Sequence, residues 1–201
     1  MHLAVKASAL QKEEWLQKQF PSSVSYEWVT ESVPEADVYV DLMYEDEGYA
    51  FSAVTEKPVL VNAVVNTATM LPLNCIRING WGGFLKNEKM EICGNTSMKT
   101  VADHIMNQLQ WKYHWVADEP GMIAPRVVAM IINEAYFGLQ DGISSKAEID
   151  VAMRLGTNYP FGPFEWAEKI GLKKIVKLLE ALAATDARYS PCDLLVKEAE
   201  A

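Results

Sequence analysis

The side chains best suited to acid–base, nucleophilic or metal chemistry are few and scattered. The chain has three histidines and three cysteines. Protein metal sites place such residues at short fixed spacings, and a disulfide framework uses an even number of cysteines. Neither pattern is present, so we expect no bound metal and no disulfide, and we expect a reducing, cytoplasmic location. The six residues are His2, His104, His114, Cys75, Cys93 and Cys192.

The elements that would position a site change character near residue 118. Up to residue 117, short valine-rich runs alternate with polar or helical ones, which is typical of a parallel α/β sheet of Rossmann type. We expect strands at 3–7, 24–29, 37–43, 58–65, 75–79, 89–93 and 113–117, and helices at 10–20 and 96–111. Glu45, Asp46 and Glu47 form an acidic run that we expect in a solvated loop.

The second part of the chain is expected to be all helical. Turn residues occupy 118–121, and apolar residues then recur at helical spacing. The run SSKAE at 144–148, with a serine cap followed by Glu148, fits a capping box, and we expect Gly142, Gly156 and Gly171 to end helices in left-handed conformations. We therefore expect two domains, 1–118 and 119–201. The expected helices are 123–140, 144–155, 163–170, 173–184 and 191–200.

Composition and charge limit the class of partner. Half of the 201 residues are apolar, so the chain should fold around a sizeable core. The net charge of −9 argues against nucleic acid and against an anionic membrane surface, because both need a basic patch. No window approaches the roughly 18 apolar residues of a membrane span, and no signal peptide is visible at the N-terminus.

An ordered series of motifs after residue 118 resembles the C-terminal helical domain of the 3-hydroxyacyl-CoA dehydrogenases. The most specific motif is YPFGPFEW at 159–166. The resemblance implies a Rossmann-like domain followed by this helical domain, and a homodimer formed through the C-terminal helices. It also implies a cleft for an acyl-CoA-like ligand. The other motifs are EPGMI at 119–123, NEA at 133–135, ID at 149–150, AM at 152–153, LG at 155–156, GL at 171–172 and SP at 190–191 with LLVK at 194–197.

The N-terminal part departs from what this resemblance implies for the NAD cofactor. The family binds NAD through a glycine-rich turn that lets the backbone approach the pyrophosphate at a helix N-terminus. Here the corresponding turn at 4–11 reads AVKASALQ, and no glycine precedes Gly48. The stretch from Phe20 to Asp37 also leaves little room for the usual second helix and third strand. We expect no NAD and no other cofactor.

The family's catalytic positions are also altered. Its general base is a histidine, and a glutamate twelve positions further on orients it; counting back from Glu91 places Asn79 at the histidine position. An amide has no titratable proton near neutral pH, so it cannot act as that base. The family's serine is Ala68 here, and the asparagine of the first C-terminal helix is Pro125. Only Glu91 survives, as a relic of the family pair.

Three further residues are candidates for a ligand cleft: Trp81, Asn66 and Arg126. Trp81 stands in a glycine-rich loop, where it would either close over a ligand or fill the space of a missing cofactor. Three hypotheses remain open for the whole chain. The first is an inactive family member that binds an acyl-CoA-like ligand or a partner protein. The second is an active dehydrogenase with displaced catalytic groups or one completed by another chain. The third is a dimerisation module without a ligand.

Overall fold

A computed structural model describes all 201 residues, and the chain divides into two compact units, Met1–Met122 and Ile123–Ala201. The division falls after Met122 instead of after Asp118, because residues 118–122 are tied to the first unit. Asp118 forms an ion pair with Arg77 there, and the Gly121 N–H donates to the Val64 carbonyl at 2.8 Å. None of the helices is long and apolar enough to cross a lipid bilayer.

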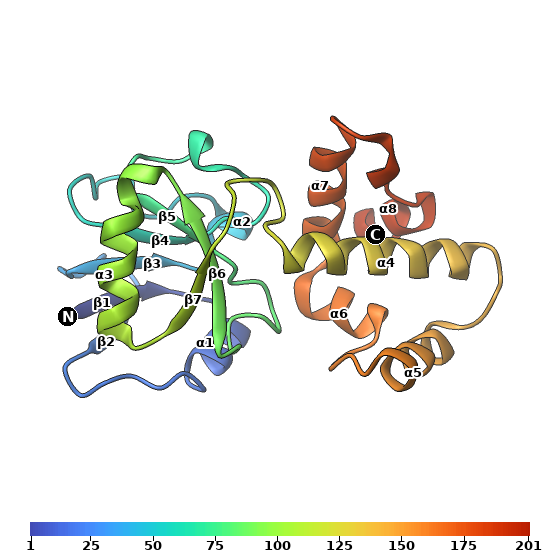
Figure 1. The fold of residues 1–201 in the computed structure, drawn as a ribbon, viewed down its shortest axis with the longest axis horizontal. Helices are drawn as coiled ribbons and strands as arrows, with labels where there is room; N and C mark the ends of the chain where they lie inside the picture. The colour runs from blue at the N-terminus through green and yellow to red at the C-terminus, as the bar shows by residue number, and fades with distance from the viewer. The chain divides into compact units, whose positions relative to one another are not determined.

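The first unit is a seven-stranded sheet in the order β2-β1-β3-β4-β5-β6-β7, in which only the β5–β6 pair is antiparallel. Figure 1 shows this α/β unit, in which α3 lies across one face of the sheet. Its strands are β1 (His2–Lys6), β2 (Ser25–Trp28), β3 (Val38–Asp41), β4 (Val59–Asn62), β5 (Cys75–Ile78), β6 (Lys89–Gly94) and β7 (Lys112–Trp115). Its helices are α1 (Ala9–Trp15), α2 (Tyr44–Glu47), α3 (Lys99–Leu109) and the short 3-10 turns η1 (Ala68–Met70) and η2 (Thr96–Met98).

Alternation along the strands places one apolar core on each face of the sheet. Leu3 and Val5 of β1 face the core under α1 and α3, where Trp15 is fully buried. Ala4, between them, faces the opposite core, which contains Phe51 from the loop after α2. Loops between strands therefore cover much of that second face. This arrangement is a reduced Rossmann-like sheet, as the sequence predicts.

The short segment between β2 and β3 contains no helix, and β1 has β2 on one side and β3 on the other. Helix α1 ends at Trp15, earlier than the expected Phe20. Trp15 packs edge-on against Tyr26, Trp28 and Trp111, with ring centres 5.3–6.4 Å apart. These aromatic contacts hold the chain after α1 against the sheet.

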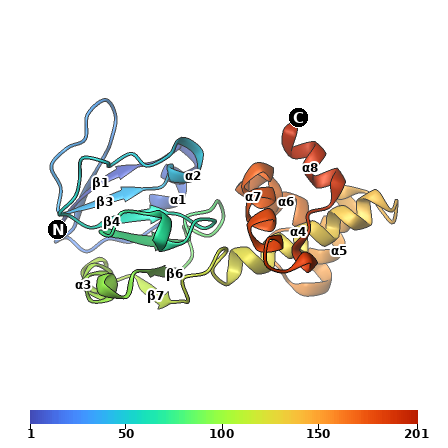
Figure 2. The ribbon, with the colours of Figure 1, turned by 90° about the horizontal axis from the view of Figure 1, so that it is seen from above.

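The second unit is entirely helical, and Figure 2 shows its helices from above. The Ser145 capping box is present: the Glu148 N–H donates to Ser145 Oγ, and Glu148 accepts from the Ser145 N–H. Gly142 and Gly171 have φ of 70° and 97° at helix ends, as expected. The expectation for Gly156 is wrong, because it lies inside α5 and Asn158 takes the left-handed cap. The elements are α4 (Ala124–Gln140), α5 (Lys146–Thr157), α6 (Pro163–Ile170), α7 (Leu172–Ala183), η3 (Ala187–Tyr189) and α8 (Asp193–Glu200).

Candidate functional site

The turn between β1 and α1 is closed by its own side chains. Ser8 caps α1 by accepting the Gln11 N–H at 3.3 Å, and the Ser8 N–H donates to Gln11 Oε1 at 3.0 Å. The Gln11 side chain is buried and also donates to the Leu42 carbonyl at 2.7 Å. A pyrophosphate needs free backbone donors and a glycine cradle at this point. The turn has no glycine, and the Ser8 and Gln11 N–H groups are already occupied, so these residues do not fit a dinucleotide cofactor.

A glutamate occupies the backbone donors that follow β4. Glu45 of α2 accepts the Val64 and Val65 N–H groups at 2.7 and 2.8 Å through one oxygen. Its other oxygen accepts the indole N–H of Trp81 at 2.5 Å. The expectation that Glu45 lies in a solvated loop is therefore wrong, because its carboxylate accepts hydrogen bonds from these three N–H groups. Only Asp46 and Glu47 of the acidic run are exposed.

Trp81 is 1% exposed and packs in the interior of the first unit. A side chain buried to this degree fills space and does not close over a ligand from solvent. Asn66, another cleft candidate, is half-buried and donates from Nδ2 to the Tyr44 hydroxyl at 2.7 Å. Trp81 and Asn66 are therefore both held by residues of α2, which the sequence did not predict as a helix.

Asn79 and Glu91 come together across the antiparallel β5–β6 pair. The Asn79 N–H donates to the Glu91 carbonyl at 3.1 Å, and Asn79 Oδ1 accepts the Trp81 N–H at 3.4 Å. Asn79 is 4% exposed, whereas Glu91 is half-buried. The spacing of twelve residues is thus that of a hairpin. The side-chain amide of Asn79 therefore bonds within its own loop.

A buried arginine of β5 that the sequence did not single out reinforces the loop after β4. Arg77 is fully buried and donates to Asp118 and to the carbonyls of Ala63 and Val64. A buried charge is tolerated only when it is paired and hydrogen-bonded in this way. The arginine within the apolar strand CIRI is the signal that could have identified this ion pair. It fixes the loop after β4 and serves no visible chemistry.

Arg126, the remaining candidate, lies in the second unit near the start of α4. Its guanidinium carbon stands 5.8 Å from the centre of the Tyr189 ring. Both residues line a cavity of about 450 Å³ whose other walls combine three apolar side chains with two charged ones. The other lining residues are Val127, Met130, Ile131, Glu134 and Arg188. The cation and the apolar wall together suit a ligand or partner with an apolar part and an acidic group.

No group of three or more histidine, cysteine, aspartate or glutamate side chains is arranged to hold a metal ion. The three cysteines are free and buried. Burial raises the pKa of Cys93 to about 12 and that of Cys75 to about 11, so neither thiol supplies a nucleophilic thiolate near neutral pH.

Comparison with known proteins assigns the second unit. Residues 121–201 match the 3-hydroxyacyl-CoA dehydrogenase C-terminal domain. A 3-hydroxyadipyl-CoA dehydrogenase of Escherichia coli K12 is 51% identical over 86 residues, which are 42% of this chain and 18% of that protein. A 3-hydroxybutyryl-CoA dehydrogenase of Bradyrhizobium diazoefficiens is 41% identical over 86 residues, which are 42% of this chain and 29% of that protein. The matched segment is therefore less than a third of either relative.

Solved structures extend the likeness to the first unit. The crystal structure of 3-hydroxybutyryl-CoA dehydrogenase from Escherichia coli K12 matches 70% of this chain and 31% of its own, with a TM-score of 0.60 and 36% identity. That of (S)-3-hydroxybutyryl-CoA dehydrogenase from Ralstonia eutropha covers 98% of this chain and 92% of its own, with a TM-score of 0.65 and 16% identity. The second comparison shows a shared fold.

Proposed function

We propose that this chain, which belongs to the 3-hydroxyacyl-CoA dehydrogenase family through its C-terminal domain, is a dimeric member without dehydrogenase activity that binds an acyl-CoA-like ligand. One observation carries the proposal. The family's base position holds Asn79, a buried amide that bonds to its own loop. Removing a positioned acid–base group costs about 10²–10⁴-fold in rate.

The cofactor region supports the same conclusion independently. The Ser8–Gln11 capping box occupies the N–H groups of those two residues at the start of α1, and Glu45 occupies those of Val64 and Val65 after β4. Restoring a dinucleotide site would therefore require new residues in the β1–α1 turn as well as a new base. A protein that had lost only one catalytic residue would need fewer changes to regain activity than this chain would.

Dimerisation and ligand binding are proposed from the second unit. Ile123, just before α4, is 57% exposed, and Val127, which itself lines the cavity together with Arg126, is 50% exposed. Exposed apolar side chains beside such a cavity favour an interface or a ligand site. A second copy of this chain is the occupant we propose for the exposed end of α4 at Ile123 and Val127, and the acyl part of the ligand for the part of the cavity that Met130 and Ile131 line.

The experiment is calorimetric titration of the purified chain with acetoacetyl-CoA, alongside sedimentation velocity. We expect saturable binding by a species of twice the chain mass. The Arg126→Met variant should bind at least tenfold more weakly, whereas Arg154→Met, on the exposed side of α5, should bind as the unchanged chain does. A dimer that shows no heat with acetoacetyl-CoA would instead favour a partner protein or a ligand-free dimerisation module.

A second function, an active dehydrogenase with displaced catalytic groups, is favoured by one specific observation. Glu91 of β6 pairs in register with His114 of β7, and His114 is exposed. Register partners on neighbouring strands project to the same face of a sheet, so a histidine and a glutamate are neighbours there. NADH oxidation that disappears in the His114→Asn variant would establish this alternative; turnover unaffected by that substitution would reject the role of His114.

A further inference from the structure

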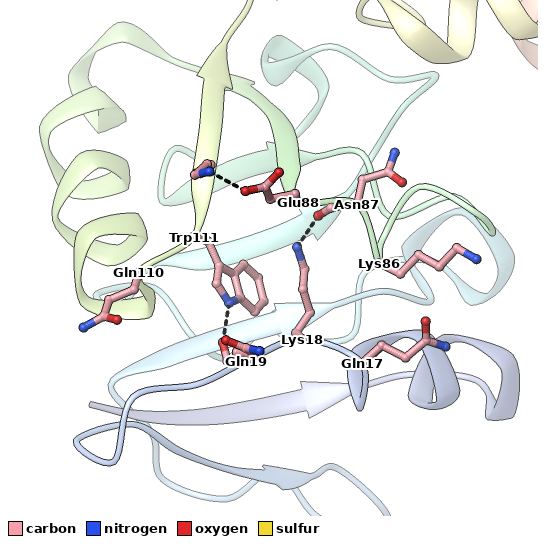
Figure 3. Close-up of a pocket in the computed structure, with 9 residues that line it drawn as sticks. Gln17, Lys18, Gln19, Lys86, Asn87, Glu88, Gln110 and Trp111 are labelled. Carbon is pink, nitrogen blue, oxygen red and sulfur yellow. Dashed lines mark hydrogen bonds and ion pairs between the residues drawn. The ribbon is translucent and has the colours of Figure 1, made fainter. Parts of the chain in front are cut away.

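A second pocket lies in the first unit, away from Asn79 and Glu45. It has a volume of about 380 Å³ and is formed by three segments: the chain after α1, the loop between β5 and β6, and the start of β7. Figure 3 shows Lys18 and Trp111 side by side in it, with Lys86 extending away. The lining residues are Gln17, Lys18, Gln19, Lys86, Asn87, Glu88, Gln110, Trp111 and Lys112.

Lys18 is a half-buried cation without a counter-ion. Its Nζ donates to the Asn87 carbonyl at 2.7 Å and stands 4.5 Å from the centre of the Trp111 ring. No carboxylate forms an ion pair with it. Burial lowers the pKa of Lys18 to about 8, because a charged amine loses hydration there. An ammonium has three N–H donors, so two remain for a ligand.

The pocket is positive on an acidic protein. Three lysines line it against one glutamate, while the whole chain carries a net charge of −9. The glutamate, Glu88, forms an ion pair with Lys112 at the rim, so it does not neutralise Lys18. The indole N–H of Trp111 donates to the Gln19 carbonyl at 3.1 Å, which fixes the ring that holds the Lys18 ammonium in place.

We propose that this pocket binds a phosphate group, as inorganic phosphate or as a small phosphate ester, with Lys18 as its principal cation. A phosphate supplies the missing counter-charge and several acceptor oxygens for the unused Lys18 donors. Lysine binds phosphate as a point charge, whereas a carboxylate is better matched by the forked guanidinium of arginine, which this pocket lacks. The amides of Gln17, Gln19 and Gln110 suit hydroxyl groups of an ester. The proposal does not depend on acyl-CoA binding at α4.

The first test is thermal unfolding at pH 7 and constant ionic strength, with inorganic phosphate, ribose 5-phosphate, acetate or chloride. Three proteins are compared: the unchanged chain, Lys18→Met, and Lys57→Met as an exposed-lysine control in the same unit. We expect both phosphates to raise the melting temperature of the unchanged chain and of Lys57→Met. In Lys18→Met the apparent affinity should fall at least tenfold. The compound that binds more tightly shows whether inorganic phosphate or a phosphate ester is the preferred ligand.

The second test detects phosphate binding at the pocket directly, through the signal of Trp111, without relying on the Lys18 variant. The chain has six tryptophans, so an NMR spectrum of the ¹⁵N-labelled protein contains six indole N–H signals. The signal of Trp111 can be identified because it is lost in Trp111→Phe. Phosphate should shift the Trp111 signal saturably, and acetate should not. Equal shifts with acetate and phosphate, no shift with either phosphate, or unchanged phosphate binding by Lys18→Met would each overturn the proposal.

Discussion

At the scale of single residues, the absence of a base at position 79 is not repaired by substitution alone. Asn79→His should give no NADH-dependent turnover, because the capped β1–α1 turn still excludes the pyrophosphate. The larger ring in a site that is 4% exposed should also lower the free energy of unfolding by about 1–3 kcal/mol. Steady-state kinetics and urea unfolding check the two expectations.

The matched control for that substitution is Asn107→His, since Asn107 is exposed on α3. It should leave the free energy of unfolding within about 0.5 kcal/mol of the starting value. Measurable turnover by Asn79→His would contradict the account, because it would show that the turn accepts a dinucleotide despite lacking glycine.

The titration of Lys18 should make the stability of the folded chain depend on pH. Its pKa falls from the ordinary 10.5 to about 8 in the folded chain, so burial of the cation destabilises the fold below pH 8. Between about pH 8 and 10.5 the folded state releases the proton before the unfolded state does, and stability rises with pH. The other charged groups that line the pocket are Lys86, Lys112 and Glu88, of which Lys112 and Glu88 are paired with each other.

The measurement is urea unfolding of the unchanged chain and Lys18→Met across that range, without phosphate. The variant should be the more stable protein at pH 7, and its advantage should shrink between pH 8 and 10.5. A loss of stability in Lys18→Met at every pH would show that Lys18 is a structural residue.

At the scale of elements, periodicity and caps predicted most of the fold. Central strands such as β4 are runs of valine and leucine, and they could be recognised because both faces of a parallel strand are buried. The serine pair followed by Glu148 located the start of α5 to within two residues for a local reason, because a cap bonds only within its own turn. Both signals lie within a few residues of the feature that they predict.

What the sequence could not reveal depends on contacts between distant segments. Glu45 looks like a solvated acid until Val64, Val65 and Trp81 are placed around it. Lys18 and Trp111 are likewise far apart in the chain and share a pocket only after folding. The positions of Asn79 and Glu91 could be predicted from the family resemblance, but their surroundings could not.

The motif YPFGPFEW gives an element-scale prediction at Gly162. A Cβ there would lie 2.3–2.4 Å from the Asp150 side chain, which accepts the Phe164 N–H at 2.8 Å. Gly162→Ala should therefore lower the free energy of unfolding by about 1–3 kcal/mol. Gly156→Ala is the control: its Cβ meets nothing within 4 Å inside α5, so a gain of about 0.5–1 kcal/mol is expected. Equal effects of the two substitutions would exclude the proposed clash.

At the scale of the whole molecule, the proposed dimer depends on the exposed face of α4. Val127→Asp should weaken self-association at least tenfold, because a carboxylate would be buried at an apolar interface. Val33→Asp is the control, since Val33 is 46% exposed in the first unit and Val127 is 50% exposed in the second. Sedimentation equilibrium should show the unchanged chain and Val33→Asp as dimers and Val127→Asp as largely monomer. Dimers of equal strength in all three would place the interface elsewhere.

The central claim is that this chain lacks the chemistry of the 3-hydroxyacyl-CoA dehydrogenases that its second unit resembles, and NADH oxidation with acetoacetyl-CoA tests it most directly. A genuine 3-hydroxyacyl-CoA dehydrogenase is assayed in parallel as a positive control. We expect no oxidation above background by a folded, purified preparation of this chain. Sustained turnover that rises in proportion to the concentration of the chain would contradict the account, because Asn79 and the capped β1–α1 turn would then be compatible with catalysis.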